Sequence, residues 1–120
     1  MKLIKILFVT AISFNLSHAQ KLNGAWKKLN KKTEDVMTIK LYSDHYFTSS
    51  TYVVNSGEFV SASAGTYSRS PSDYVENYEI DSDHRSVTGS FLNFDYTIEN
   101  DTLRLQDKNS RNSEVWVRID

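Results

Sequence analysis

The stretch E-V-W-V-R near the end of the sequence carries three residues that could form a chemical site. Glu114, Trp116 and Arg118 alternate with two valines. Because successive side chains of a β-strand point to opposite faces, these three share one face. If that face is inside, Arg118 needs a partner, since burying an unpaired charge is costly. We expect Glu76 to be this partner, with Glu114 as the second candidate.

A Glu76–Arg118 pair surrounded by tyrosine hydroxyls has two interpretations. It could be a closed structural network. It could equally be an anion site, in which the carboxylate of a ligand approaches Arg118. The residues alone leave both open.

Tyrosines separated by small hydroxyl residues form the second candidate feature. A packed core favours Val, Ile and Leu, whereas amphipathic tyrosine faces suit a lining that touches water or a ligand. Alternatively, the tyrosines are exposed strand residues with good β-propensity, because a change of register by one residue swaps the two faces. The candidate ligand-binding residues are Tyr46, Tyr52, Tyr67, Tyr74, Glu76, Tyr78, Trp116 and Arg118.

Other chemistries lack their characteristic residues. The sequence has no G-x-S-x-G nucleophile motif, and its four glycines form no phosphate-binding loop. There is no cysteine, and His45 and His84 each stand beside an aspartate in a predicted turn, so we expect no metal site. The segment D-S-D at 81–83 lacks the glycine and closing glutamate of a calcium loop. We therefore expect neither a cofactor nor enzymatic activity.

The elements that must position these residues read as strands. Period-two segments recur at short spacing between turn residues, a pattern typical of β-barrels and sandwiches. The predicted strands are about Gly24–Asn30, Val36–Tyr42, His45–Val54, Glu58–Arg69, Tyr74–Ile80, Ser86–Phe91, Asn93–Ile98, Thr102–Gln106 and Glu114–Ile119.

Eight or nine sequential strands with short connections predict an all-β fold, an antiparallel up-and-down barrel of about eight strands. A Greek-key sandwich is the alternative, but it needs longer crossovers than the sequence offers. On the second strand, hydrophobicity predicts that Met37, Ile39 and Leu41 point inward. Without disulfides, a closed sheet is one way to stabilise so small a domain.

The first residues are expected to lie outside this domain. Residues 1–5 carry two lysines, residues 6–16 are almost wholly apolar, and Ser17-His18-Ala19 ends in a small residue. This is the pattern of a secretory signal peptide cleaved after Ala19. The apolar run of about eleven residues is shorter than the ~20 that a spanning helix needs. We expect residues 1–19 to be the signal peptide, residues 20–120 to form the domain, and the protein to be secreted or periplasmic.

Charge argues against nucleic acid as a partner. The whole chain has a net charge of −1, and removal of Lys2 and Lys5 leaves 12 basic against 15 acidic residues, a net charge of −3. Nucleic-acid binding would require a basic patch. The lysines at 27, 28, 31 and 32 are expected to be a solvated strand end and turn.

Several motifs together resemble small secreted bacterial lipocalin-like proteins of the calycin superfamily. They are L-x-G-A-W at 22–26, G-x-F and G-T-Y at 57–67, Y-x-E at 74–76, D-T-L at 101–103 and E-V-W-x-R at 114–118. The resemblance implies a barrel in which Gly24, Trp26 and Arg118 form a structural staple, the guanidinium packing over the indole. The chain is shorter than true lipocalins, with no room for their long first loop.

Three functions are compatible with such a barrel. The first is binding of a small, partly apolar or amphipathic ligand, which could carry an anionic group. The second is a protein-interaction module or protease inhibitor with a filled barrel, whose protein partner the sequence does not name. The third and weakest is an enzyme acting through Glu76, the tyrosines and Arg118.

Overall fold

The computed structural model describes residues 21–30, 35–82 and 90–120, and their regular structure is entirely β. The signal peptide predicted at residues 1–19 lies outside the described residues. No helix in the described part of the chain is long and apolar enough to cross a membrane. The eight strands are β1 (Gly24–Lys28), β2 (Val36–Tyr42), β3 (Tyr46–Val53), β4 (Phe59–Arg69), β5 (Asp73–Asp81), β6 (Phe91–Glu99), β7 (Thr102–Asp107) and β8 (Ser113–Arg118).

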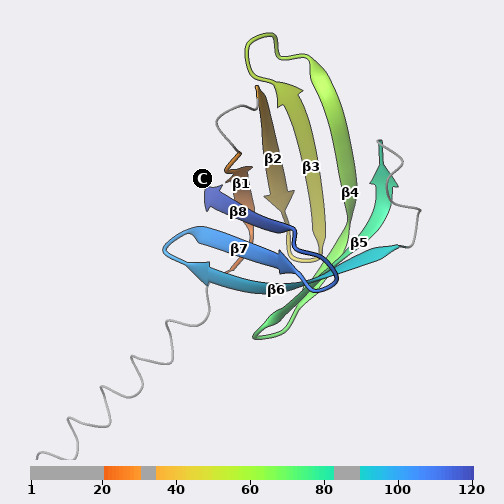
Figure 1. Cartoon of the computed structure of the whole chain (residues 1–120), viewed down its shortest axis with the longest axis vertical. Coiled ribbons are helices and arrows are strands. Elements are labelled where there is room, and N and C mark those ends of the chain that lie inside the picture. Colours follow the sequence, from red (N-terminus) through yellow and green to blue (C-terminus); the bar gives the residue numbers. More distant parts are fainter. Residues whose placement is uncertain (1–20, 31–34, 83–89) are drawn as a thin grey trace, which may run out of the picture.

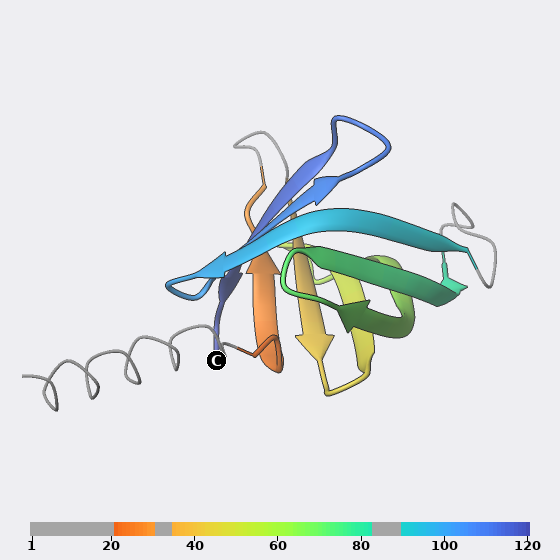
Figure 2. The same cartoon turned by 90° about the horizontal axis from the view of Figure 1, so that it is seen from below.

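The strands form a closed antiparallel barrel in sequence order, so the predicted up-and-down barrel is confirmed and the sandwich is excluded (Figure 1). Each strand pairs with the next, and β8 closes the barrel on β1, where Trp26 lies opposite Arg118. The view in Figure 2 shows the strands placed around a ring. Closure leaves no long unpaired edge, as expected for a small chain without disulfides.

Strand β6 is one continuous strand, whereas the sequence predicted two strands in this region, Ser86–Phe91 and Asn93–Ile98, separated at Leu92. Residues Phe91 to Asp95 pair continuously with residues Asn77 to Asp73 of β5, which keeps this segment in one strand. The part of the predicted strand at 86–89 lies outside the described residues.

The inward face of β2 was predicted wrongly. Lys40 is only 5% exposed and Leu41 is 49% exposed, so the strand turns Thr38, Lys40 and Tyr42 inward. Pairing with β3 sets this register, since Lys40 lies opposite Ser49 and Tyr42 opposite Phe47. Hydrophobicity alone favours the other face, but a buried partner for Lys40, described below, offsets the desolvation of its charge.

The interior is packed with aromatic residues at one end, which we call the closed end. It is formed by the start of β1 and the end of β2, with the corresponding ends of the other strands. The buried cluster consists of Leu22, Trp26, Tyr42, Phe47, Tyr74, Phe94, Leu103, Leu105 and Trp116. The indole N–H of Trp26 donates to the carbonyl of Leu22 at 2.7 Å, so this buried donor is satisfied.

Arg118 packs over Trp26 at the closed end of the barrel. Its Cζ lies 4.3 Å from the centre of the Trp26 ring. Its N–H groups donate to the carbonyls of Asn23 and Lys21, each at 2.6 Å, and to Asp101 at 3.0 Å. The contact that the resemblance implies between the first and last strands is therefore present, and these bonds tie the chain before β1 to the end of β8.

Gly65 allows β4 and β5 to approach closely. A Cβ at this position would lie 1.8 Å from the carbonyl oxygen of Asn77, and the β4–β5 register shifts between Ala64 and Gly65. Only glycine fits such an approach of two backbones. At this shift Gly65 pairs with Tyr78 of β5.

Candidate functional site

An ion pair lies in the middle of the barrel. Lys40 Nζ of β2 is 2.5 Å from Glu76 Oε2 of β5, and the two side chains are 6% and 2% exposed. The strands that carry them are on different sides of the ring, so the pair spans the interior. The sequence predicted Glu76 to be paired with Arg118, and this is wrong, because Arg118 lies at the closed end and bonds Asp101.

Tyrosine hydroxyls complete the surroundings of the Glu76 carboxylate. Tyr74 donates to Oε2 at 2.5 Å and Tyr78 donates to Oε1 at 2.7 Å. The hydroxyls of Tyr42 and Tyr74 are 2.6 Å apart and share a further hydrogen bond. Tyr74, Glu76 and Tyr78 alternate along β5, and this alternation explains how one strand supplies both donors and the acid. The carboxylate thus has three donors, Lys40 included.

Aromatic rings surround the ammonium group. Lys40 Nζ lies 4.7 Å from the ring centre of Trp116, 5.3 Å from that of Phe47 and 5.7 Å from that of Tyr42. Cation–π attraction at a desolvated site contributes about 2 kcal/mol. The ammonium is therefore stabilised by one carboxylate and by three ring faces or edges, and this explains a buried lysine in so small a domain.

Electrostatics keep the pair ionised. Burial by itself would raise the pKa of Glu76, but the Lys40 ammonium and the three hydrogen bonds outweigh it, and the pKa is lowered. Burial would lower the pKa of Lys40, and the neighbouring carboxylates of Glu76 and Glu114 raise it instead. Burial raises the pKa of Tyr74 and of Tyr78, and the Glu76 charge adds to this, so both remain donors.

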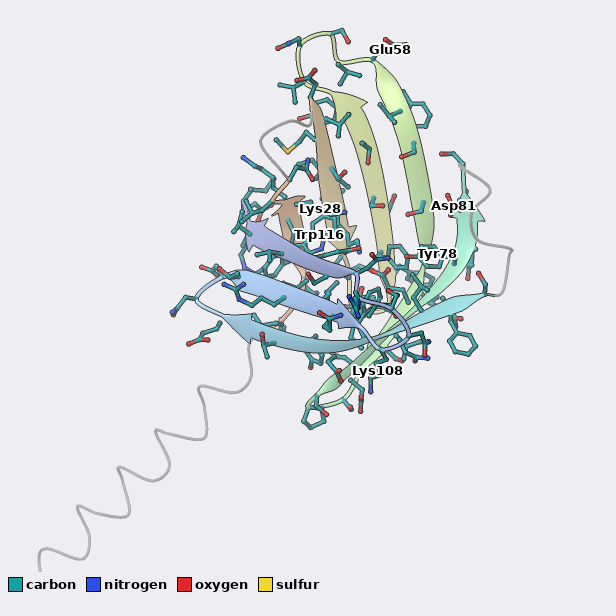
Figure 3. All side chains as sticks on the ribbon, in the orientation of Figure 1. Lys28, Glu58, Tyr78, Asp81, Lys108 and Trp116 are labelled. Carbon is teal, nitrogen blue, oxygen red and sulfur yellow. The ribbon has the colours of Figure 1, made fainter. Side chains whose placement is uncertain are left out.

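A cavity of about 540 Å³ opens above the ion pair at the end of the barrel opposite Trp26. In Figure 3, Lys28 and Trp116 lie on one side of this space, and Tyr78 and Asp81 lie on the other. Lys40, Glu76 and Tyr78 form its floor. The described part of the walls is mainly polar and comes from every strand except β7 and from the loop before β8. Its residues are Lys28, Thr38, Ser49, Thr51, Ser61, Ala62, Ser63, Asp81, Leu92, Asn112, Ser113, Glu114 and Trp116.

Hydroxyl groups of three adjacent strands make up one wall. Thr38 and Thr51 share a hydrogen bond of 2.7 Å, and Ser49 and Ser63 share one of 2.8 Å. The register explains both pairs, because Thr38 lies opposite Thr51 and Ser49 opposite Ser63. On the other side, the indole N–H of Trp116 donates to Glu114 at 2.9 Å.

The structure separates the predicted ligand-binding residues into groups. Glu76, Tyr78 and Trp116 line the cavity. Tyr74 is fully buried beneath the cavity and contributes to its floor only through its hydrogen bond to Glu76. Tyr67 packs against the closed-end cluster and donates a hydrogen bond to the carbonyl of Ser43. Three others lie away from the cavity: Tyr46, which is 60% exposed, Tyr52, which shares the outer face of β3 with Tyr46, and Arg118.

Lys40 and the hydroxyl wall were missed by sequence reasoning. Lys40 was assigned to the outer face because its neighbours Ile39 and Leu41 are apolar. The signal that could have found it lies on β3, where Phe47, Ser49 and Thr51 alternate as the partner face. No sequence pattern, however, joins Lys40 to Glu76, 36 residues away.

The arrangement can bind polar groups. The described part of the chain leaves no buried side-chain nitrogen or oxygen without a hydrogen-bond partner. The raised pKa of Lys40 keeps its ammonium group protonated, so it acts as a hydrogen-bond donor. In the described ranges, no three His, Cys, Asp or Glu residues are grouped so that they could hold a metal ion.

The sequence matches no model of a known protein family, and it matches no curated protein. The fold is nevertheless compatible with a lipocalin-like barrel, since it is closed, antiparallel and up-and-down with eight strands.

Proposed function

We propose that the chain is a non-catalytic binding protein that holds a small molecule in the open half of its barrel. The single observation that carries this proposal is the cavity of about 540 Å³ above the Lys40–Glu76 pair. Ligand sites in proteins are typically concave and of ~300–1,000 Å³, with a few polar groups that fix the orientation of the ligand.

The division of the barrel into two halves supports this function. The closed end is filled by aromatic side chains and already stabilises the fold, whereas the open half leaves space that a compact core would fill. An interaction module with a filled barrel would need no such space. The protonated states of Lys40 and Tyr78 also favour binding over an enzyme, because neither can act as a base at neutral pH.

We further propose that the protein is a secreted or periplasmic member of the lipocalin-like calycins. The support is the signal-peptide pattern of residues 1–19, the motifs described above and the barrel topology. The anionic group that the sequence allowed for the ligand depended on Arg118. Because Arg118 lies at the closed end, the proposal does not include that group.

Native mass spectrometry of the protein purified from the cells that make it tests the proposed function. Two variants of neighbouring β3 residues make a matched pair: Ser49→Phe fills the cavity, and Ser50→Phe adds the same ring on the exposed face. We expect a small molecule to be retained by the wild type and by Ser50→Phe and to be lost in Ser49→Phe. Equal retention by all three, or by none, would contradict the proposal.

A further inference from the structure

We infer that the ligand is a neutral, hydroxyl-rich molecule of the class to which short saccharides belong. This inference rests on the proposed function and narrows it. Three features of the cavity lead to it: the hydroxyl wall, the balance of charge and the scarcity of apolar lining.

The hydroxyl wall offers hydrogen bonds that a ligand can use. Each hydroxyl has one donor and two acceptor positions. The Thr38–Thr51 and Ser49–Ser63 bonds use one donor per pair, so each pair keeps one further donor and several acceptor positions. An apolar ligand that displaced water from this wall would leave these groups without hydrogen-bond partners, and this would weaken its binding. A ligand with many hydroxyls would replace the water bonds one for one.

The charges on the cavity walls do not favour an anion. Lys40 and Glu76 neutralise each other on the floor. Among the described residues higher up in the lining, the cation Lys28 is matched by the acid Glu114. These charges together therefore give an anionic ligand no net positive charge to bind. Carboxylates are strong acceptors for hydroxyl donors, so the same set suits a neutral polyol.

Apolar side chains are few among the described residues of the lining. Leu92, Ala62 and the rings of Tyr78 and Trp116 contribute the apolar groups, and they come from different strands. A fatty chain requires a continuous apolar surface, because its binding free energy grows with the apolar area that it buries. A few apolar groups among many hydroxyls fit instead the alternating C–H and O–H groups of a saccharide ring.

NMR titration of the isotope-labelled full chain tests this inference, with glucose, N-acetylglucosamine, cellobiose and maltose as polyol probes and decanoate as the apolar probe. We expect at least one saccharide, and not decanoate, to shift the amide signals of Thr38, Ser49, Thr51 and Ser63. The double variant Thr38→Val/Thr51→Val keeps the shape of the wall and removes two hydroxyls. It should weaken saccharide binding at least tenfold, whereas Thr48→Val on the exposed face should leave it unchanged.

The outcomes separate the inference from the proposed function. If only decanoate shifts the cavity amides, the saccharide class is wrong and small-molecule binding stands. If no saccharide shifts them, the inference is also wrong, and the mass-spectrometric comparison of Ser49→Phe with Ser50→Phe then decides the proposed function alone. Binding that survives Thr38→Val/Thr51→Val unchanged would overturn the role of the hydroxyl wall. Folding of the variant is checked by the dispersion of its own spectrum.

Discussion

Removal of the Glu76 carboxylate should strongly destabilise the barrel, because it leaves the Lys40 ammonium without its carboxylate. In Glu76→Leu, the hydroxyls of Tyr74 and Tyr78 also lose their acceptor. In the reverse change, Lys40→Met, the carboxylate keeps both tyrosine donors. We therefore expect Glu76→Leu to be the more damaging of the two.

The magnitude follows from the surroundings of Lys40. Breaking a buried pair by removing one partner typically costs about 3–5 kcal/mol. Alternatively, the Lys40 side chain stays buried in the variant but loses its proton. For a lysine with an ordinary pKa of about 10.4, deprotonation at pH 7 costs about 4.6 kcal/mol. Both routes give a loss of about 3–5 kcal/mol in the free energy of unfolding. For a domain of this size, that corresponds to a fall in Tm of about 12–40 °C.

The double variant Lys40→Met/Glu76→Leu provides the control. Replacing a whole buried pair by apolar residues is often neutral or stabilising by about 1–4 kcal/mol. Urea unfolding at pH 7, followed by tryptophan fluorescence, gives the four free energies of the cycle. We expect the double variant to recover most of the loss and a coupling free energy of at least about 2 kcal/mol. A loss below about 1 kcal/mol in Glu76→Leu, or simple additivity of the two single changes, would refute the buried pair.

Three further predictions concern acid stability, backbone packing and closure. Because the pKa of Glu76 in the folded protein lies below its ordinary value, the ionised carboxylate contributes fully to stability above about pH 4.5, and this contribution is lost as the pH falls through the folded pKa. Tyr78→Phe removes one hydrogen-bond donor to this carboxylate, so acid unfolding of the variant should begin at a higher pH than that of the wild type. An unchanged midpoint of acid unfolding would contradict this. Gly65→Ala should cost about 3 kcal/mol, the upper end of the usual range for overpacking, because its Cβ would lie 1.8 Å from a backbone oxygen, whereas Ala64→Ser should cost little. Equal denaturant midpoints for the two variants would count against the close approach of β4 and β5. Arg118→Leu should lower the free energy of unfolding by about 1–3 kcal/mol and speed hydrogen exchange at Ala25 and Trp26, without affecting the Glu76 network. Exchange that stays slow in this variant would argue against Arg118 as the residue that holds the closed end together.

The alternation of residue types and the turn spacing were sufficient to predict the barrel, but the faces of individual strands were harder. On β8 the alternation grouped Glu114, Trp116 and Arg118 on one face without deciding whether that face is inside, and the burial of Trp116 shows that it is. On β2 the pattern failed, because Ile39 and Leu41 look like core residues and Lys40 does not. Local hydrophobicity has no information about a partner on another strand, and the partner here, Glu76, decides which face is buried.

The candidate site was predicted in part for the same reason. Glu76 and Tyr78 could be identified from the Y-x-E pattern and the tyrosine spacing, and both lie on the cavity floor. The partner of Glu76 could not, since pairing across the barrel depends on the registers of all the strands between β2 and β5, including the shift at Gly65. Arg118 was the more obvious cation by sequence, but its position at the end of β8 places it against Trp26.

The two indole N–H signals of the protein provide the most direct test of ligand binding in the open half. Trp116 lines the cavity, whereas Trp26 is buried at the closed end and bonds the carbonyl of Leu22. Both resonances can be followed in one proton–nitrogen NMR titration with the probe that binds most tightly. We expect the Trp116 indole signal to shift with saturation while the Trp26 signal stays in place. A bound probe that leaves the Trp116 signal unmoved would contradict ligand binding in the cavity.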